Sequence, residues 1–304
     1  MIKIAILDYP SSLTSARYGL LEMFEMANQA CETQALDYQF TAQIIATHQL
    51  EMTETAFDVV LIPPSHQGDY YLSPDKSLTT WLAQQHHQGA VLGSACAGTF
   101  ILAAAQLLVG KRATTHWGLE ALFIETHPNI SLEIDKILIN EGEIISAGGM
   151  MSWVDLGLEV VATFASLQVM RQLGKSLVVD TGQREQRYYQ QFSANLQHSD
   201  ANILLLQKHL HSHFQETNNI DNMAAHCHLT PRTLQRRFVK ATGLKPHYYL
   251  QRLRIQKACE LLENTALSFE VIATQIGYQD SSACRKLFVN IMGLSPSEFK
   301  KRFV

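Results

Sequence analysis

The residues of this chain with the clearest chemical potential surround Cys96. In the run GSACAGTF (93–100), an apolar strand pattern ends at a cysteine and a helical pattern begins on small residues. Such a turn would hold the Cys96 side chain at the carboxyl edge of a sheet, where open α/β folds bind ligands. The free N–H groups at the start of the helix would lower the pKa of the thiol. The other interpretation is a small buried cysteine selected for packing.

His116 and Trp117 come after the helix that follows this turn. At this position after the helix, their side chains could line a pocket. A histidine beside a tryptophan is also typical of a structural residue whose imidazole is satisfied by a backbone partner. Asp155, at the start of a later helix, is expected to act as a first-turn charge rather than as a ligand.

A different chemistry is predicted in residues 220–243. A short helix is followed by Thr230, a good N-cap, and Pro231, which suits the first position of the next helix. That helix buries Leu234 and Phe238. Its other faces carry Arg232, Thr233, Gln235 and Arg236. A short helix, a tight turn and a helix with exposed Arg and Gln are what docking in the major groove requires, because Arg reads guanine and Gln reads adenine.

The same pattern returns in residues 268–293. Ser268 is expected to cap the first helix of this second unit and Asp280 the second helix. The second helix exposes Ser281, Ser282, Arg285 and Lys286. A long amphipathic helix, about residues 248–262, separates the two units. It could place two recognition helices in successive major-groove turns on one face of DNA.

Charge is divided unevenly along the chain. Residues 1–198 contain 10 Lys and Arg against 20 Asp and Glu, whereas residues 199–304 contain 14 against 8. A basic segment joined to an acidic one indicates that the C-terminal third meets a polyanion. Without the two motifs, a solvated basic surface would explain the charge equally well.

Strands alternating with helices must position Cys96. Strands are predicted at 3–9, 40–47, 57–64 and 90–95. Their near-continuous apolar runs predict a parallel sheet covered on both faces. A long helix from about Trp153 to Leu173 is expected to close this domain. The predicted fold is an α/β, flavodoxin-like sandwich of a parallel sheet between helices, joined to an all-α C-terminal domain of two helix-turn-helix units.

The predicted boundaries give a ligand-sensing domain at 1–175, a linker at 176–200 and a DNA-binding domain at 201–304. The linker has mixed polarity and no sustained period, and its Tyr188-Tyr189 pair could dock on the first domain. A helix from about Ala201 to Phe214 opens the last domain.

Cysteine usage and the first residues bear on where the protein works. The five cysteines are scattered and lack CxxC spacing, so neither a disulfide framework nor a zinc site is expected and a reducing cytosol fits best. The apolar run in MIKIAILDYP is too short for a secretory signal or a membrane span. No metal and no cofactor are predicted, and the expected location is cytoplasmic.

Two segments, SACAGTFILAAAQLLVGKRATTHW and ISAGGMMSWVDLGLEVV, resemble the ThiJ/PfpI branch of the class I glutamine amidotransferase-like superfamily. More narrowly, they resemble the version that is fused to transcription regulators, and the resemblance covers about residues 1–175. It implies that Cys96 stands at the position of the nucleophile and that His116 lies near it.

The sequence departs from the enzymes of that superfamily at three points. Ala16 falls where they have an acidic side chain, Pro64 offers no N–H to an oxyanion, and Ala97 rather than histidine follows the cysteine. We therefore expect hydrolysis to be lost and the pocket to be kept for binding. The expected lining is Cys96, Ala97, His116, Trp117 and Ser65.

The C-terminal third resembles the AraC/XylS family over about residues 205–304. The segments LTPRTLQRRFVKATG, LQRLRIQKACELL, IATQIGYQDSS and GLSPSEFKKRF follow in that family's order and spacing. The resemblance implies base contacts from Arg232, Gln235 and Arg236, and then from Ser281, Ser282 and Arg285. Lys286 stands where the family often has Arg, and Cys284 where it often has Phe or Leu, so the second unit would read DNA less sharply or contact mainly phosphate. Lys300, Lys301 and Arg302 would contact phosphate or form a solvated tail.

The sequence thus predicts a transcription regulator, not an enzyme. A small metabolite near Cys96 and His116 would shift the dimer or the interdomain geometry and so change how DNA is held. The expected partners are double-stranded operator DNA, a small-molecule effector, a second copy of the chain and RNA polymerase, with no membrane. The alternatives are a cysteine hydrolase or amidase with a DNA-binding tail, and a redox sensor that acts through Cys96.

Overall fold

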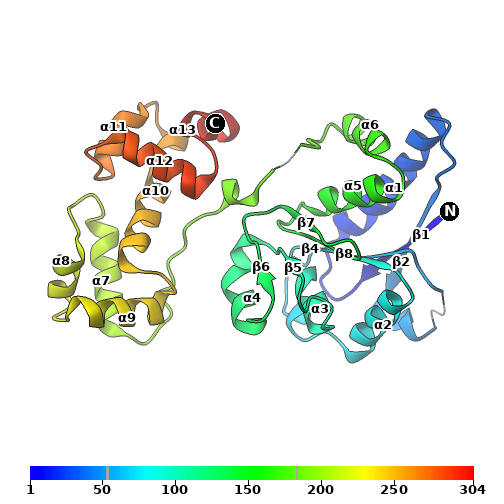
Figure 1. Ribbon diagram of the computed structural model, residues 1–304, viewed down its shortest axis with the longest axis horizontal. Helices are drawn as coiled ribbons and strands as arrows, with labels where there is room; N and C mark the ends of the chain where they lie inside the picture. Colours follow the sequence, from blue (N-terminus) through cyan, green and yellow to red (C-terminus); the bar gives the residue numbers. More distant parts are fainter. Residues whose placement is uncertain (53–54, 183) are drawn as a thin grey trace. The chain divides into compact units, whose positions relative to one another are not determined.

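The computed structural model describes residues 1–52, 55–182 and 184–304. The chain forms two compact units, Met1–Gln186 and Arg187–Val304 (Figure 1). In the described part of the chain, no helix combines the length and the apolar character that a membrane span needs.

A six-stranded sheet forms the centre of the first unit. Its strands are β1 (Ile2–Asp8), β2 (Phe40–Ala46), β3 (Val59–Ile62), β4 (Val91–Ala95), β7 (Leu138–Asn140) and β8 (Ile144–Ala147). They lie in the order β2-β1-β3-β4-β8-β7, and all are parallel except β7, which is antiparallel to β8. A separate parallel pair joins β5 (Arg112–Ala113) to β6 (Ser131–Leu132). The four predicted strands are β1 to β4, whereas the short β5 to β8 were not predicted.

Successive residues of the central strands point into two different cores. On β1, Ile4 and Ile6 pack on one face of the sheet, and Ala5 and Leu7 pack on the other; all four are fully buried. This is why the strands are apolar throughout instead of alternating with polar residues. The predicted α/β sandwich is confirmed.

Helices cover both faces of the sheet (Figure 1). One face is covered by α1 (Thr14–Thr33), α5 (Trp153–Phe164) and α6 (Leu167–Leu177). The other is covered by α2 (Lys76–His87), α3 (Gly98–Ala104) and α4 (Glu120–Thr126). Short 3-10 turns are η1 (Thr47–Met52), η2 (Tyr70–Leu72) and η3 (Trp117–Leu119).

The single helix expected from Trp153 to Leu173 is wrong, because the structure has two helices there. Ser166 is extended and caps α6, its hydroxyl accepting a hydrogen bond from the Val169 N–H at 3.2 Å. A serine that caps a helix offers the backbone an alternative to continuing the preceding one.

The second unit is helical, as predicted. Its helices are α7 (Ala201–Ser212), α8 (Ile220–His226), α9 (Pro231–Thr242), α10 (Pro246–Asn264), α11 (Phe269–Gln275), α12 (Ser281–Met292) and α13 (Pro296–Phe303), preceded by the turn η4 (Gln186–Tyr189). The predicted caps are confirmed: Thr230 accepts from the Thr233 N–H, Ser268 from Val271 and Asp280 from Ser282.

Helix α10 takes part in both cores of the second unit. Near its start, Tyr249, Leu250 and Leu253 pack with α7, α8 and α9. Toward its end, Ile255 and Leu262 pack with α11, α12 and α13. Its 19 residues span about 28 Å at 1.5 Å per residue. The two helix-turn-helix units therefore have separate cores on one continuous helix.

The segment 176–200 is shared between the two units. Gln186 is buried in the first unit, whereas Phe192 and Ala194 join a core of the second. The expectation that Tyr188 and Tyr189 could dock on the first domain is wrong. The guanidinium of Arg302 lies 5.2 Å from the Tyr188 ring centroid, and the rings of Tyr189 and Phe303 meet edge to face at 5.4 Å.

Candidate functional site

Helix α9 presents polar side chains to solvent from its first two turns. Leu234 and Phe238 are fully buried in the core of the first helix-turn-helix unit. The helical period therefore leaves Arg232, Gln235 and Arg236 exposed. Thr233 is half-buried, and its hydroxyl accepts a hydrogen bond from Thr230 at 3.0 Å. The structure thus brings the four predicted residues of this unit to one end of a capped helix.

Arg237, the next residue on α9, has a different role that the sequence did not indicate. Its guanidinium donates two hydrogen bonds to Asp200, the N-cap of α7, at 2.8 and 2.6 Å. These hydrogen bonds hold the pKa of Asp200 below its usual value. Arg237 therefore ties α9 to α7.

Helix α12 has an arrangement of buried and exposed side chains similar to that of α9. Cys284 and Phe288 are fully buried, Ser282 and Lys286 are exposed, and Ser281 is half-buried. Both helices contain 12 residues and end at a glycine in the left-handed conformation, Gly243 with φ 75° and Gly293 with φ 72°. A residue with a side chain would be strained at either position.

Arg285 is engaged within its own helix-turn-helix unit. Its guanidinium forms an ion pair with Glu270 of α11 at 2.8 Å and lies 4.9 Å from the Phe269 ring centroid. Base contact by Arg285 would require it to leave Glu270. Among the C-terminal cations, Lys300 donates to the Thr265 carbonyl at 2.9 Å, so it also has a partner inside the unit.

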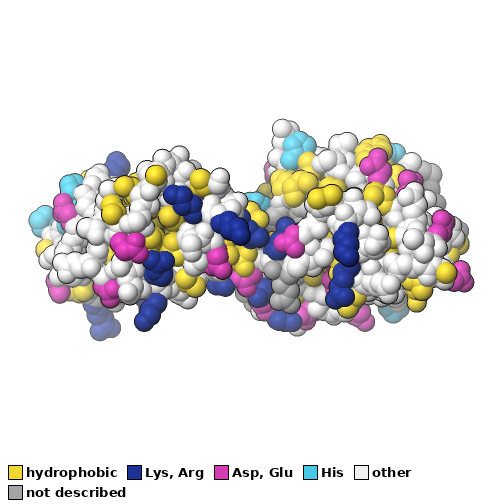
Figure 2. Space-filling model, turned by 90° about the horizontal axis from the view of Figure 1, so that it is seen from above, with side chains coloured by type: hydrophobic (Ala, Val, Ile, Leu, Met, Phe, Trp, Pro, Cys, Tyr) yellow, Lys and Arg dark blue, Asp and Glu magenta, His cyan; other side chains and the backbone are white. Residues whose placement is uncertain are grey.

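Positive charge and exposure coincide on the second unit. Figure 2 shows Lys and Arg side chains projecting from its surface. Arg232 and Arg236 on α9 and Lys286 on α12 are exposed to solvent. Long cationic side chains with this freedom suit contacts with phosphate and base edges.

Cys96 occupies the sharp turn that the sequence predicts. Its φ is 54°, a left-handed backbone that is uncommon for a residue with a side chain. The Cys96 N–H donates to the Ala147 carbonyl at 2.8 Å, and its carbonyl accepts from the Thr115 hydroxyl at 2.7 Å. Gly98 lets the following helix approach β3 closely, because a Cβ there would lie 2.7 Å from the Ile62 carbonyl oxygen.

The expected lowering of the Cys96 pKa is wrong. Burial raises the pKa of the thiol to about 12, and the hydrogen bond from the Ala97 N–H offsets only part of this rise. Cys96 is 2% exposed and Ala97 is 1% exposed. The cost of burying a thiolate thus exceeds the benefit of the helix N-terminus.

His116 has the local structural role that was the second interpretation. Its Nδ1 accepts a hydrogen bond from the Gly118 N–H at 2.9 Å, which caps η3. Its ring lies beside that of Trp117 at a centroid distance of 5.2 Å. Burial lowers the pKa of His116. Thr115, not His116, makes the hydrogen bond to Cys96.

The loop after β3 is held to the end of β1. The Pro63 carbonyl accepts from the Tyr9 hydroxyl at 2.6 Å, and the Pro64 carbonyl accepts from the Leu13 N–H at 2.7 Å. The Ser65 hydroxyl lies 3.1 Å from the Ser11 carbonyl and is 7% exposed as a residue. These two carbonyl oxygens are therefore engaged with β1 and its loop, and Pro63 and Pro64 have no N–H to donate to an oxyanion.

A cavity of about 500 Å³ opens beside this loop. It is lined by Pro10, Ser11, Gly68, Asp69, Tyr70, Leu72 and Ser73. Tyr70 stacks on Tyr9 at 5.8 Å, and Ser11 is the hydrogen-bond partner of Ser65. Among the five predicted pocket residues, all within the described ranges, Ser65 alone forms a hydrogen bond with a residue that lines this cavity. The sequence could have indicated the cavity, because its lining follows β1 and β3 and parallel sheets bind ligands at the carboxyl ends of their strands.

Metal binding has no support from side-chain placement. In the ranges 1–52, 55–182 and 184–304, no group of three His, Cys, Asp or Glu residues is placed to hold a metal ion.

Comparison with known proteins matches both units. A model of the DJ-1/PfpI family matches residues 26–163, and a model of a helix-turn-helix domain matches residues 223–302. The HTH-type transcriptional regulator CdhR of Pseudomonas aeruginosa is 28% identical over 224 residues, 73% of this chain and 66% of CdhR. The HTH-type transcriptional regulator GbdR of the same species is 24% identical over 224 residues, 72% of this chain and 60% of GbdR. The aligned region thus spans about two thirds or less of the length of these relatives.

A solved structure shares the fold of part of the chain. The structure of a putative transcriptional regulator from Vibrio parahaemolyticus has a TM-score of 0.50 and 20% identity, covering 58% of this chain and 98% of that one. The two matched domains, in this order, confirm the family resemblance seen in the sequence. The chain thus carries a DJ-1/PfpI domain ahead of a helix-turn-helix domain, and it is similar to HTH-type transcriptional regulators.

Proposed function

We propose that this protein is a sequence-specific DNA-binding transcription regulator whose affinity for DNA is controlled by a small molecule bound in its first unit. The observation that carries the proposal is that α9 and α12 share the same features. Each is a 12-residue helix with a side-chain N-cap and a left-handed glycine end, and each exposes polar side chains from its first turns. Two such helices on one continuous α10 suit two major-groove contacts.

The base contacts that we propose follow from exposure and chemistry. Arg232 and Arg236 would each reach guanine, and Gln235 would reach adenine, through paired hydrogen bonds. Thr233 is near enough to the helix start to contact the DNA backbone. In the second unit, Ser281, Ser282, Arg285 and Lys286 would face DNA, with Lys286 on phosphate.

The effector site that we propose lies at the carboxyl edge of the sheet. The cavity beside Tyr70 would be its entrance. Cys96 and Ala97 are too deeply buried to meet a ligand without a rearrangement of this edge. Ser65, His116 and Trp117 are the remaining pocket residues that we propose, and of these His116 and Trp117 are half-buried.

We propose that the protein does not hydrolyse its ligand. A thiol whose pKa is raised to about 12 is almost wholly protonated near neutral pH, and the thiolate is the nucleophile that cysteine hydrolysis needs. Ala16 is fully buried and has no titratable group to serve as the acid. The same protonated thiol also makes Cys96 a poor redox sensor.

The partners that we propose are operator DNA, the effector, a second copy of this chain and RNA polymerase. Two copies would place two pairs of recognition helices on paired half-sites. We place the protein in the cytoplasm, where DNA and RNA polymerase are accessible.

Binding of the full-length protein to the DNA upstream of its own coding region, titrated against salt, tests this function. We expect selective binding that weakens steeply with salt, because cations on α9 and α12 release counterions from DNA. Arg232→Ala with Arg236→Ala should remove the selectivity. Arg171→Ala is the matched control, since Arg171 is an exposed arginine on α6 of the first unit. Equal loss in the control, or binding that ignores sequence in every variant, would contradict the proposal.

A further inference from the structure

Gln186 is the last residue of the first unit, and its side-chain amide is buried among backbone and hydroxyl groups. Gln186 is 2% exposed. Its Nε2 lies 2.7 Å from the Thr115 carbonyl, 3.0 Å from the Thr114 hydroxyl and 3.1 Å from the Lys136 carbonyl. Its Oε1 accepts from the Trp117 N–H at 3.1 Å. Both ends of the amide are therefore satisfied by the segment 114–117 and its neighbour.

The surroundings of Gln186 are shaped to hold it. Gly148, just after β8, leaves the space for the amide, because a Cβ there would collide with the Gln186 side chain. The Gln186 N–H donates to the Asp135 carbonyl at 2.9 Å. The preceding residue, Glu185, pairs with Lys136 at 3.1 Å. The chain is thus fixed to the first unit by main-chain and side-chain contacts up to Gln186.

The contacts of Gln186 lead directly to the turn at Cys96. Thr115, whose carbonyl accepts from Gln186, donates its own hydroxyl to the Cys96 carbonyl at 2.7 Å. Trp117, whose N–H donates to Gln186, follows His116. Movement of residues 114–117 would therefore change the hydrogen bonds of Gln186.

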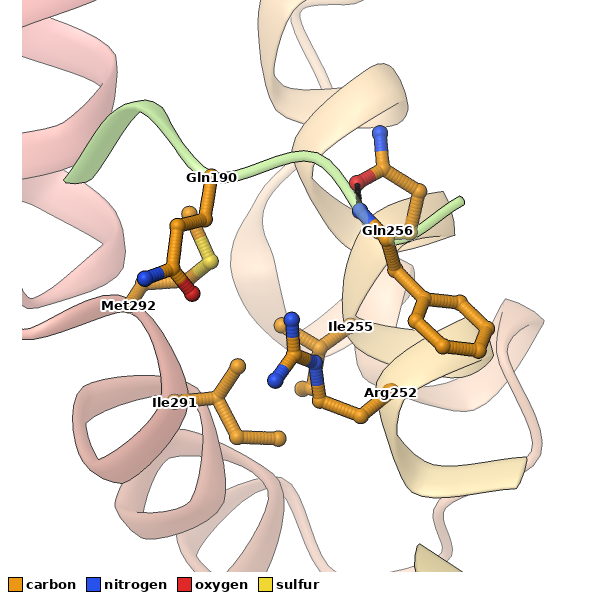
Figure 3. A pocket seen from close by; sticks show the side chains of 7 residues that line it. Gln190, Arg252, Ile255, Gln256, Ile291 and Met292 are labelled. Carbon is orange, nitrogen blue, oxygen red and sulfur yellow. Dashed lines mark hydrogen bonds between the residues drawn. The ribbon is translucent and has the colours of Figure 1, made fainter. Parts of the chain in front are cut away.

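The residues directly after Gln186 belong to the second unit. Residues 187–195, which we call the strap, contact both of its helix-turn-helix halves. At the end of α12, Gly293 leaves space for Arg187 and Tyr188, since a Cβ there would collide with the Arg187 side chain. On α10, the Gln256 Oε1 accepts from the Phe192 N–H at 3.0 Å (Figure 3).

Beyond α10, the strap reaches the other half of the unit. The Phe192 ring meets that of Tyr249 edge to face at 5.0 Å, and the Asn195 carbonyl accepts from Gln207 of α7 at 2.9 Å. Figure 3 shows the strap passing beside α10 and α12, with Gln190 next to Met292. The strap is therefore placed to influence how the two halves are held along α10.

We propose that Gln186 is a latch that couples the Cys96 turn to the DNA-binding unit. This inference rests on the proposed function. A ligand that shifts residues 114–117 would free or reseat the Gln186 amide, and the strap that begins at the next peptide bond would transmit the change to α10 and α12. Coupling through two alternative arrangements of one segment is the physical basis of such regulation.

The test uses the full-length protein, with a substitution at the turn in place of the unidentified effector. Thr115→Val removes the hydrogen bond to the Cys96 carbonyl with little change of shape. We expect it to change the Kd for the upstream DNA by about five-fold or more in the natural chain. In a Gln186→Ala background the same substitution should change the Kd by less than about two-fold. Gly148→Ala should reproduce Gln186→Ala, because it displaces the amide without altering it. Gln172→Ala, an exposed glutamine on α6, is the control.

Hydrogen exchange gives a readout that does not need DNA binding. Gln186→Ala should speed exchange at the Trp117 N–H and also at the Phe192 N–H, which lies in the other unit. Faster exchange at Trp117 alone would overturn the latch, because the effect would then be local. An equal Thr115→Val effect on Kd with and without Gln186, or none in the natural chain, would also overturn it. If the natural chain binds no DNA selectively, the proposed function fails, and the exchange at Phe192 still decides whether the latch exists.

Discussion

Arg237 and Asp200 form a two-point contact between α9 and α7, with hydrogen bonds of 2.8 and 2.6 Å. Asp200 also caps α7 by accepting from the Ile203 N–H at 3.3 Å. Arg236, one residue earlier on α9, is exposed. Two adjacent arginines thus have separate roles, one inside the unit and one toward solvent.

Substitutions at these positions should separate stability from DNA binding. Asp200→Ala removes a helix cap, which typically costs about 1 kcal/mol, and it also removes the partner of Arg237. Arg236→Ala should leave thermal unfolding almost unchanged but weaken DNA binding. Thermal melts and anisotropy titrations of the two variants check this. If both substitutions lower the melting temperature equally, Arg236 and Arg237 do not have these separate roles.

The Asp200 contact should make stability depend on acid pH. Hydrogen bonds from Arg237 lower the pKa of Asp200 from its ordinary value of 3.8. The contribution to stability is therefore present above pH 3.8 and is lost as pH falls through the lower pKa of the folded state. Denaturant unfolding of the natural chain and of Asp200→Asn, measured from pH 6 to pH 3, should give free energies of unfolding that draw closer as the pH falls below 3.8. If the difference in free energy of unfolding between the two proteins stays the same or increases at acid pH, Asp200 does not make this contribution.

Cys96 should react slowly with alkylating reagents. Its pKa is raised to about 12 from the ordinary 9.0 by burial, so the labelling rate at pH 7 should lie far below that of a free thiol. The folded state keeps the Cys96 proton that the unfolded chain loses near pH 9. The contribution of this buried thiol to stability is therefore full below pH 9 and declines above it. Cys96→Ala should retain DNA binding. Rapid labelling of Cys96 at pH 6, followed by mass spectrometry, would instead favour a hydrolase or a redox sensor.

The sequence predicted those parts of the fold that depend on local patterns. Apolar runs identified β1 to β4, and Thr230, Ser268 and Asp280 were recognisable as caps before their helices. The strand β8 was missed because its four residues carry no period of their own and are stabilised by pairing with β4. The break between α5 and α6 was missed because apolar residues continue across Ser166.

The site was less predictable, since its important contacts join distant residues. Gln186 lies in a polar run with several other glutamines, and its partners Thr114 and Trp117 are 72 and 69 residues away. Asp200 is separated from Arg237 by 37 residues. Position in the sequence placed Cys96 at the turn correctly, but the sign of its pKa shift depended on burial. Only the packed structure determines that burial.

Glu270 should restrain the second recognition helix. Its ion pair with Arg285 at 2.8 Å holds that guanidinium against α11. Glu270→Gln should free Arg285 and strengthen DNA binding at low salt, by about two- to five-fold. Glu263→Gln removes one negative charge from an exposed position on α10 and is the control for charge alone. The gain should vanish when Arg285→Ala is added, and a gain that survives this addition would mean that Arg285 is not the residue released.

The two recognition helices should differ in what they read. Gln235 is an exposed amide on α9 that can pair with adenine, so Gln235→Ala should cost about 1–3 kcal/mol on the preferred site and relax the choice of base at one position. Lys286 is an exposed point charge on α12, so Lys286→Ala should weaken binding to all sequences alike and reduce the salt slope by about one. Competition binding against operator DNA with single base-pair changes, repeated at several salt concentrations, distinguishes the two outcomes. A base-specific loss in Lys286→Ala, or a uniform loss in Gln235→Ala, would reverse the assignment of reading to α9 and anchoring to α12.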